Sequence, residues 1–541
     1  MRGIMELSYE ELNVLAGNYR TVPVTKTLPI AVREPVETFR ALKNLSKQCF
    51  ILESLEDTGC WGRYTFLGYD PKLEISGIDG VLSIKNGATI QIETFDPASY
   101  ISGILDENRG PALPGLPSFT GGLVGYFSFD YIKYGEPVLR RKTVPAAANC
   151  SANCSANCGA NMPDNMPVFK DFDLMLFDKV IAYDRLKGEI VIIITIKTDS
   201  FEENYKRAKG ELEHLARIIT AGTQAEIPRL RILSPFRPLF SAAQYNRMTR
   251  RAIEYIHEGD IFQVVLSNQY EADVEGSLFD TYRILRELNP SPYMFYFSSD
   301  DIEIAGASPE TLVKLKDEEV FTFPLAGTRP RGKTPDEDAA LERELLADEK
   351  ELAEHTMLVD LGRNDLGRIC EFGSVVVEKY RAIERFSHVM HIGSTVKGRI
   401  RAGNNALDAI NAVLPAGTLS GAPKIRACQI IRELEEGGGG ATANVAALNA
   451  AETGDAGTSG AARGLYGGAI GYLDWSGNMD ACIAIRLAYK RGGKVFARSG
   501  AGIVADSVPE KEYAECQNKL AAVMRALEQA AGASVLTSFK L

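Results

Sequence analysis

The chain has 541 residues, of which 45% are hydrophobic and 24% are charged, and its 60 basic and 71 acidic residues give a net charge of −11. At about 100–200 residues per domain, this length allows roughly three or four domains, or fewer large ones, each with an ample core. The negative charge excludes a general binder of nucleic acid or of anionic membrane surfaces, although a local basic pocket for a small anion is compatible with it.

Membrane and export signals are not apparent in the sequence. The strongest apolar run, 190–196, is as short as a strand, whereas a membrane helix needs about 18 apolar residues. Residues 1–13 lack the apolar core and the small-residue cleavage site of a signal peptide. The nine cysteines follow no disulfide-like spacing, which suits a reducing compartment. We therefore expect a cytoplasmic protein.

The first part of the chain has the alternating pattern of antiparallel strands. Between residues 35 and 200, short runs such as 64–68 and 81–92 are separated by turn residues. A further strand is expected over 188–196. Residues 201–220 then show apolar side chains at helical spacing among charges, which predicts an amphipathic helix.

A linker separates this part from the second half of the chain. Residues 221–234 contain Gly222 and Pro228, which are typical of irregular segments, and the second half begins near Ser241. Three helices are expected there from the helical spacing and the positions of proline and glycine, over 244–259, 334–362 and 509–530.

Two low-complexity segments interrupt this pattern, 146–167 and 436–462. Neither has enough apolar residues to form a packed element. Cys150, Cys154 and Cys158 recur every four residues in the first segment. That spacing matches no zinc or iron–sulfur pattern, so a repeat expansion is favoured over a metal site.

Two pairs of glutamates have the spacing of a single helical face. Glu351 and Glu354 lie three residues apart in one expected helix, and Glu512 and Glu515 repeat this spacing in another. Two such pairs would offer oxygen ligands to one Mg²⁺. Taken alone, the four residues are better explained by two solvated helix faces than by a metal site.

Glycine-rich segments and basic side chains lie in the same half. Residues 326–331 are expected to form a tight turn, and 500–502 a glycine turn whose N–H groups favour an anion. Arg486 ends a strand-like run and is suited to binding a carboxylate, although a surface ion pair is the plainer explanation of a lone arginine. Of the five histidines, His388 and His391 lie three apart, and one is a candidate acid or base.

Six motifs in one order resemble the chorismate-binding enzyme family, and within it the large subunits of anthranilate synthase. The resemblance is strong over about residues 240–530 and more diffuse over 35–185. The motifs are NPSPYMF (289–295), GASPET (306–311), PLAGTRPRG (324–332), EHTMLVDL (354–361), LPAGTLSGAPK (414–424) and GAGIVAD (500–506).

The resemblance implies a reaction. Chorismate is a dianion with an enolpyruvyl ether. Ammonia attacks ring carbon C2, the C4 hydroxyl leaves, and the intermediate loses pyruvate and becomes anthranilate. Such a site needs groups that bind two carboxylates, Mg²⁺ on the ring carboxylate, an acid for the leaving hydroxyl and a group that assists elimination.

The resemblance also implies roles for single residues. Glu354 and Glu515 resemble the Mg²⁺ ligands, with Glu351 and Glu512 near the metal and holding its waters. Glu310 resembles the general acid, which burial must keep protonated, and His391 resembles the histidine that assists pyruvate elimination. The residues that resemble chorismate contacts are Gly327, Thr328, Tyr466, Arg486 and the backbone of Gly500, Ala501 and Gly502.

Two positions distinguish this chain from relatives with similar chemistry. Isochorismate and salicylate synthases carry a lysine at the position of Gln263, and aminodeoxychorismate synthases typically carry one at Ala326. Gln263 and Ala326 therefore favour ammonia as the nucleophile. The alternatives are component I of aminodeoxychorismate synthase and a non-catalytic subunit that binds tryptophan.

The resemblance further implies regulation and a partner. The Leu-Glu-Ser segment at 52–54 resembles a tryptophan feedback motif, and Ser54 with Pro292, Tyr293 and Met294 would hold the effector. The sequence has no glutamine-amidotransferase nucleophile motif, so a separate glutaminase subunit is expected to supply ammonia.

We therefore expect an α+β fold in which antiparallel sheets form a sandwich-like core with flanking helices. Residues 1–230 would form the N-terminal domain with the tryptophan site, 235–530 the catalytic domain, and 531–541 a tail. The segment 436–462 precedes Tyr466. A solvated insertion is favoured for it over a flap that covers the substrate.

Overall fold

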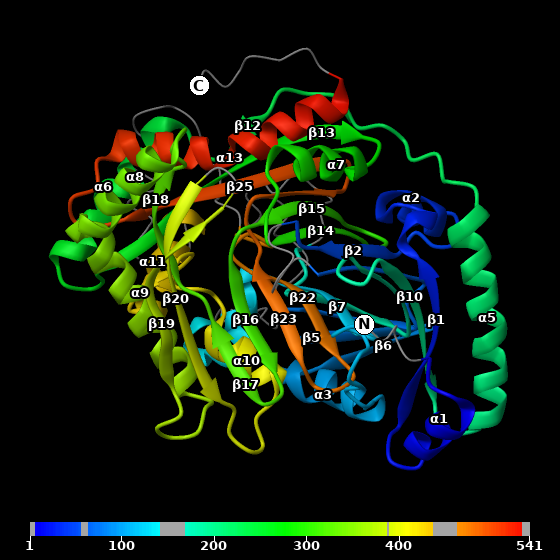
Figure 1. Ribbon diagram of the computed structural model, residues 1–541. Helices are drawn as coiled ribbons and strands as arrows, with labels where there is room; N and C mark the ends of the chain where they lie inside the picture. The colour runs from blue at the N-terminus through cyan, green and yellow to red at the C-terminus, as the bar shows by residue number, and fades with distance from the viewer. Residues whose placement is uncertain (1–5, 56–62, 141–167, 387–388, 437–461, 533–541) are drawn as a thin grey trace, which may run out of the picture.

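The structure is a computed structural model that describes residues 6–55, 63–140, 168–386, 389–436 and 462–532 (Figure 1). The low-complexity segments at 146–167 and 436–462 lie outside these ranges except for residues 436 and 462. His388, the repeated cysteines Cys150, Cys154 and Cys158, and the expected tail beyond residue 532 also lie outside them.

The first of two large antiparallel sheets has 13 strands and combines both halves of the chain. Apart from β12 (Arg237–Pro238) and β21 (Gly421–Ala422), which also pair with β13, its strands are, in spatial order, β1 (Thr21–Pro29), β10 (Glu189–Lys197), β9 (Lys179–Asp184), β3 (Tyr64–Tyr69), β2 (Cys49–Glu53), β14 (Tyr293–Ser298), β15 (Glu303–Ser308), β24 (Leu487–Arg491), β25 (Lys494–Ile503), β13 (Gln263–Glu275) and β11 (Arg231–Ile232).

The second sheet has 12 strands and also crosses between the halves. Apart from β19 (Val376–Arg385), which pairs with β20, its strands are, in spatial order, β18 (Leu325–Pro330), β20 (Val389–Arg399), β17 (Glu319–Thr322), β16 (Thr311–Lys316), β23 (Met479–Ile483), β22 (Ala469–Asp474), β7 (Gly122–Phe127), β8 (Phe172–Phe177), β4 (Leu73–Ile78), β5 (Val81–Asn86) and β6 (Ala88–Glu93). Both sheets thus run across the expected domain boundary near residues 230–235.

The helices lie outside the sheets (Figure 1). They are α1 (Tyr9–Ala16), α2 (Pro35–Leu42), α3 (Pro97–Glu107), α4 (Ile132–Gly135), α5 (Phe201–Ala221), α6 (Ala242–His257), α7 (Phe279–Leu288), α8 (Pro335–Ala347), α9 (Glu349–Gly367), α10 (Ala406–Val413), α11 (Lys424–Glu436) and α13 (Pro509–Ala531).

The core has layers because each sheet buries both faces. Phe50 and Phe295 of the first sheet pack with Met175 and Ile470 of the second, which fills the space between the sheets. On the outer face of the first sheet, α2, α5, α7 and α13 cover a second apolar cluster, and α9 and α10 cover the outer face of the second sheet. This arrangement confirms the expected α+β sandwich with flanking helices.

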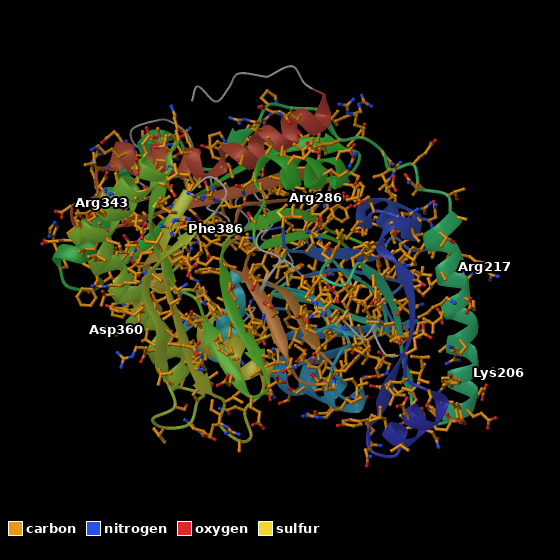
Figure 2. The ribbon with its side chains drawn as sticks, viewed as in Figure 1. Lys206, Arg217, Arg286, Arg343, Asp360 and Phe386 are labelled. Carbon is orange, nitrogen blue, oxygen red and sulfur yellow. The ribbon has the colours of Figure 1, made fainter. Side chains whose placement is uncertain are left out.

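Local patterns placed several elements correctly. The expected helix at 201–220 is α5, whose Lys206 and Arg217 point away from the sheet (Figure 2). The expected helix at 244–259 begins two residues earlier, because Ser241 and Gln244 form a capping box. The run over 81–92, expected among the antiparallel strands and hairpins, is a hairpin of β5 and β6 that turns at Gly87, where φ is +72°.

The single helix expected over 334–362 is wrong, because two helices occupy this region. Asp348 has extended backbone between α8 and α9, and its carboxylate accepts hydrogen bonds from the N–H groups of Lys350 and Glu351. An aspartate that caps a helix competes with helix continuation. The break lets α9 start in a new direction with Glu351 in its first turn.

Among the described residues, no helix is long and apolar enough to cross a membrane. The described cysteines at 49, 370, 428, 482 and 516 are buried, and each of these five has a free thiol.

Candidate active site

The glycine segment at 500–502 is part of a strand and not the expected turn. It continues β25, pairing Gly500 with Ser267 and Gly502 with Val265 of β13. Pairing with β24 on the other side ends at Ala497. Beyond Ala497, this edge of β25 therefore has no strand partner in the described sheet, and alternate residues direct their backbone N–H and C=O groups toward it. The expected anion-binding N–H groups lie at a strand edge and not in a turn.

Two glycines here allow close approach of side chains. A methyl group on Gly502 would lie 2.6 Å from Nε2 of Gln263, and one on Gly500 would lie 3.0 Å from the hydroxyl of Tyr466. Gln263 Nε2 in turn donates to Oε1 of Glu354 at 3.3 Å. Glycine at these positions thus lets three side chains meet at one strand edge. They are Gln263, which bears on the choice of nucleophile, Tyr466, a predicted chorismate contact, and Glu354, a predicted metal ligand.

Arg486 is a cation without an ion-pair partner among the described residues. It lies between β23 and β24 with a left-handed φ of 52°, and its half-buried guanidinium has no ion pair within the described residues. Burial lowers its pKa, and it is electrostatically coupled to Tyr466 and His391. A partly buried guanidinium without a carboxylate partner is a ready site for an anion.

His391 lies on β20 opposite Thr328 of β18. The register shifts between Ala326 and Thr328, and the bulged residue Gly327 has a φ of +67°. The expected tight turn at 326–331 is therefore wrong, because this segment is a strand with a bulge. The glycine at this bulge also lets Glu351 approach, since a methyl group there would lie 3.2 Å from its Oε2.

The hydrogen bonds of His391 define its chemistry. Its Nδ1 lies 2.9 Å from the carbonyl oxygen of Gly327 and 3.1 Å from Oγ1 of Thr328. Because a carbonyl only accepts, Nδ1 carries the proton and Nε2 presents its lone pair. Burial and the charge of Arg486 lower the pKa of His391, so the ring is neutral near pH 7 and suited to act as a base.

Glu310 follows β15 and is protonated at neutral pH. Burial raises its pKa to about 8, against the opposing effects of a hydrogen bond from Thr418 and the charge of Lys519. The Thr418 hydroxyl donates to Oε1 of Glu310 at 3.2 Å. A carboxyl group that keeps its proton at pH 7 has the property needed in a general acid.

The four predicted metal glutamates remain as two pairs on α9 and α13. Burial and the neighbouring charge of Glu354 raise the pKa of Glu351, and burial and then Glu515 raise that of Glu512. Across the described chain, no group of three or more His, Cys, Asp or Glu side chains is arranged to hold a metal. The like-charged pairs nevertheless have the chemistry of a site for a hard divalent cation.

Lys519 is a site residue that the sequence reasoning missed. Its Nζ lies 2.7 Å from Oε1 of Glu515 and donates to the carbonyl oxygen of Gly500 at 3.3 Å. It thus joins a predicted metal ligand to the strand edge and faces Glu310 electrostatically. Its position four residues after Glu515, on the same helical face, was a signal that could have found it.

The two basic residues of the 326–331 segment have structural roles. Arg329 forms ion pairs with Glu344 and Asp348, and Arg331 pairs with Asp338. Both guanidiniums are therefore held in ion pairs by α8 and by its C-terminal cap. An ion pair was the plainer explanation for a lone arginine in the sequence.

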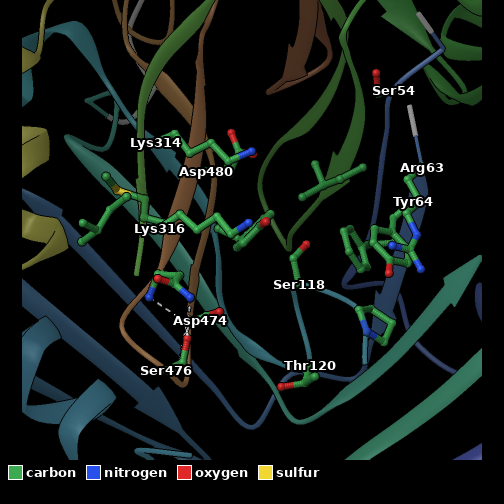
Figure 3. A pocket seen from close by; sticks show the side chains of 18 of the residues that line it. Ser54, Arg63, Tyr64, Ser118, Thr120, Lys314, Lys316, Asp474, Ser476 and Asp480 are labelled. Atoms are coloured by element: carbon green, nitrogen blue, oxygen red, sulfur yellow. Dashed lines mark hydrogen bonds and ion pairs between the residues drawn. The ribbon is translucent and has the colours of Figure 1, made fainter. Parts of the chain in front are cut away.

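All four predicted effector residues line one cavity of about 610 Å³, whose lining includes none of the predicted catalytic, chorismate-binding or metal residues. The cavity lies between the two sheets, where Met294 of β14 pairs with Glu53 of β2. Figure 3 shows Ser54, Arg63 and Tyr64 on one side and Lys314, Lys316 and Asp480 on the other. The hydroxyl of Tyr293 in the cavity wall donates to Asp480 at 2.8 Å. The structure thus brings together two motifs more than 200 residues apart in the sequence.

Glu53, next to Ser54, joins this cavity to the helical layer. Its fully buried carboxylate accepts hydrogen bonds from Arg286 and Tyr282 of α7 and from Arg185 at 3.1 Å (Arg286 is labelled in Figure 2). Helix α7 packs against α13, which carries Glu512 and Glu515.

Comparison with known proteins places the chain in a family. The profile of chorismate binding enzymes matches residues 47–525. The anthranilate synthase component 1 of Acetivibrio thermocellus is 39% identical over 531 residues, covering 96% of this chain and 98% of that relative. The relative of the same name from Aquifex aeolicus is 39% identical over 529 residues, covering 97% and 98%.

Solved structures agree. The anthranilate synthase component I of Streptococcus pneumoniae has a TM-score of 0.66 at 33% identity, covering 91% of this chain and 98% of that one. The menaquinone-specific isochorismate synthase of Escherichia coli has a TM-score of 0.65 at 17% identity, covering 95% and 99%, and shows the shared fold alone. Because the profile spans most of the chain and the relatives extend over nearly all of it, the chain belongs to the family of chorismate-binding enzymes.

Proposed function

We propose that the chain is the large subunit of an anthranilate synthase, which converts chorismate and ammonia to anthranilate and pyruvate. The observation that carries this proposal is the unpaired guanidinium of Arg486 beside Tyr466 and the open edge of β25. A dianion requires such a cation and such N–H groups in one place. The names of the relatives of 39% identity support the reaction.

Gln263 supports ammonia as the nucleophile. Its Nε2 is engaged by Glu354, while its buried Oε1 has no hydrogen-bond partner among the described residues. An unpaired buried carbonyl oxygen is costly, and an N–H of ammonia would satisfy it. A lysine at this position would instead activate water, and Ala326 leaves C2 of the ring open to an external nucleophile.

Each of the chain's own groups would then have one task. Arg486, Tyr466 and the β25 edge hold the carboxylates, and the Gln263 carbonyl orients ammonia toward C2. Glu310 gives its proton to the C4 hydroxyl, which leaves as water while the C2–N bond forms. The ammonium group formed at C2 gives up one proton to solvent. The Nε2 of neutral His391 then accepts the proton from C2 as the C3–O bond breaks, which releases the aromatic ring and the enolate of pyruvate, and a proton returns to the methylene carbon of that enolate to give pyruvate.

We propose Mg²⁺ as the cofactor. Two like-charged glutamate pairs, one on α9 and one on α13, fit a hard divalent cation, and the charge of Lys350 on α9 reaches Glu512 on α13. Glu354 and Glu515 would hold the ion, with Glu351 and Glu512 holding its waters. When bound, Mg²⁺ supplies positive charge for the ring carboxylate. Gln263 and Lys519 would keep Glu354 and Glu515 oriented.

The test of this function is a fluorescence assay with chorismate, Mg²⁺ and ammonium at alkaline pH. We expect direct appearance of anthranilate, and loss of turnover with a chelator. Aminodeoxychorismate that requires a lyase to yield a further product, or no turnover at all, would overturn the proposal.

We further propose a separate glutaminase subunit as the source of ammonia in a reducing cytoplasm. Burial raises the pKa of Cys428 and of Cys49 to about 12 and that of Cys370 to about 11. These thiols are therefore poor nucleophiles at neutral pH. We expect the chain alone to use ammonium but not glutamine, and glutamine to support turnover only when that partner is added.

Tryptophan is proposed as the effector of the cavity between the sheets. Its walls combine the aromatic rings of Tyr64 and Phe66 with polar groups such as Ser54 and Asp480, which suits an amphipathic aromatic amino acid. The contacts from Glu53 through α7 to α13 supply a route from this cavity to the proposed metal ligands. Feedback would require two packings of these elements with different affinities for tryptophan.

A substitution at Ser54 tests the effector site. Ser54→Phe should fill the cavity end and raise the tryptophan concentration for half inhibition by about tenfold or more, with little change in chorismate turnover. Ser54→Ala is the matched control, because it removes the hydroxyl without occupying the cavity. Inhibition curves of Ser54→Phe that coincide with wild type would rule out this site.

The second low-complexity segment is predicted to be dispensable. Glu435 at the end of α11 pairs with Arg463 at 2.6 Å, both side chains being almost fully buried. Arg498 also donates to the carbonyl oxygen of Ala462. Because these contacts fix both ends, replacing 437–461 with a short linker should leave the chorismate KM within about twofold of wild type. A large rise in KM would instead support a flap over the substrate.

A further inference from the structure

A small cavity of about 40 Å³ connects Glu310 to a buried ion pair that the mechanism above does not use. Its lining includes Glu310, Thr418, Thr322 and Asp365. The cavity has room for about two or three water molecules. It lies between the residue proposed as the acid and helix α9.

The ion pair is Asp365 of α9 with Lys424 of α11, whose charged atoms lie 2.7 Å apart. The side chains are 6% and 9% exposed, respectively, and Lys424 also donates to the carbonyl oxygen of Val413 at 2.9 Å. A buried ion pair is weak evidence for stability, since taking both charges out of water offsets most of their attraction. Its position beside a cavity that Glu310 also lines therefore points to a functional explanation.

Two threonine hydroxyls lie within the mostly apolar lining of this cavity. Thr418 lines it and donates to the Glu310 carboxyl. The buried hydroxyl of Thr322, which also lines the cavity, has no partner among the described residues. Buried hydroxyls are normally satisfied by protein or by ordered water. The unsatisfied hydroxyl thus marks a place for water between the two carboxyl groups.

We propose that water in this cavity carries protons from the Asp365–Lys424 pair to Glu310, which restores the general acid after each turnover. The inference rests on the proposed role of Glu310. When the C4 hydroxyl leaves as water, Glu310 becomes a carboxylate; it takes a proton from a cavity water, which takes one from the pair, and the pair regains one from solvent. One proton moves inward for each hydroxyl lost, and the ammonium group formed at C2 gives up one proton to solvent, so the turnover consumes no net proton.

The charges around this route are few. Lys519 faces Glu310, and Lys424 and Arg368 face Asp365. Burial is the largest effect on both carboxyl groups and raises the pKa of each. Asp365 does not touch the substrate and acts through Glu310. Its loss should therefore affect proton delivery and leave the binding of chorismate unchanged.

The experiment removes the whole pair, so that no buried charge is left unpaired. Asp365→Asn/Lys424→Met is compared with Asp171→Asn/Lys133→Met, which removes a second buried lysine–aspartate pair with a 2.8 Å contact and 9% and 4% exposed side chains, away from Glu310. For the first variant we expect kcat to fall by about tenfold or more, an increased solvent deuterium isotope effect on kcat and an unchanged chorismate KM. The control should keep the wild-type kcat, isotope effect and chorismate KM, because the removal of a whole buried pair away from the cavity changes no proton route.

A milder variant keeps the test decisive if the double variant does not fold. Thr322→Val removes the unsatisfied hydroxyl with little change of shape and should also increase the isotope effect. Wild-type isotope effects in both Thr322→Val and the folded double variant would overturn the proton route. If Glu310→Gln keeps full turnover, Glu310 is not the general acid. If Glu310→Gln loses turnover while the other two variants behave like wild type, Glu310 is the acid but the proposed proton route is wrong.

Discussion

Replacing Glu310 by glutamine should lower kcat for anthranilate formation by about 100- to 10,000-fold, the usual contribution of a general acid. Glutamine keeps the size of the side chain and can still accept the hydrogen bond that Thr418 donates to Glu310. It cannot give a proton to the leaving hydroxyl. The chorismate KM should change little, because the proton transfer contributes only as the C4–O bond breaks.

The pH dependence of the wild-type enzyme should report the same group. Burial raises the pKa of Glu310 to about 8, so the acid is present below this pH and is lost above it. Because free ammonia increases with pH, kcat must be extrapolated to saturating ammonia at each pH. A plateau that falls above about pH 8 is expected. A kcat that stays level to pH 10 would contradict the assignment.

A change at Thr418 gives the matched control for that profile. The hydrogen bond from Thr418 stabilises the carboxylate and lowers the pKa of Glu310. Thr418→Val should therefore raise this pKa and move the alkaline limb to higher pH.

The stability of the folded protein should also depend on the protonation of Glu310. Since the folded pKa lies above the ordinary value, the stability contribution of Glu310 is lost as the pH rises through about 8. Glu310→Gln has no such loss and should be no less stable than wild type at that pH.

The second large effect is expected at Arg486. Arg486→Gly should lower kcat/KM for chorismate by about 100- to 1,000-fold, because one carboxylate loses its charged, forked hydrogen-bond donor. Arg486 has a left-handed φ of 52°, a conformation that costs an ordinary residue about 1–2 kcal/mol. Glycine avoids this strain, so thermal stability should stay level or rise while chorismate binding falls.

Arg486→Lys separates charge from geometry. Lysine keeps the positive charge but cannot donate two parallel hydrogen bonds, so it should recover only part of kcat/KM. The measurement compares wild type, Arg486→Gly and Arg486→Lys. It determines kcat/KM for chorismate from steady-state kinetics and the affinity for chorismate in the absence of ammonia. If Arg486→Gly binds chorismate as wild type does, the guanidinium does not hold a carboxylate and the site must lie elsewhere.

Sequence patterns predicted an element well where the side chains of one short segment determine its secondary structure. Apolar side chains at helical spacing placed α5 and α13 nearly residue by residue. The glycine segments were harder. Both 326–331 and 500–502 were expected to be turns, but each lies in a strand. Glycine there leaves space for neighbouring side chains and does not reverse the chain direction. Glycine content alone does not distinguish these two uses.

The sequence by itself determined the residue types of the chemistry: two glutamate pairs, a histidine, an arginine and a glutamine where relatives carry lysine. The resemblance already paired Ser54 with Met294, which line one cavity. Tertiary structure alone decided that β25 has an open edge beyond Ala497 and that Asp365 lies near Glu310. The physical reason is that local side-chain periodicity specifies an element and its buried face, but not its partner strand. Both sheets join strands from distant parts of the chain, and only that pairing brings the chemical groups together.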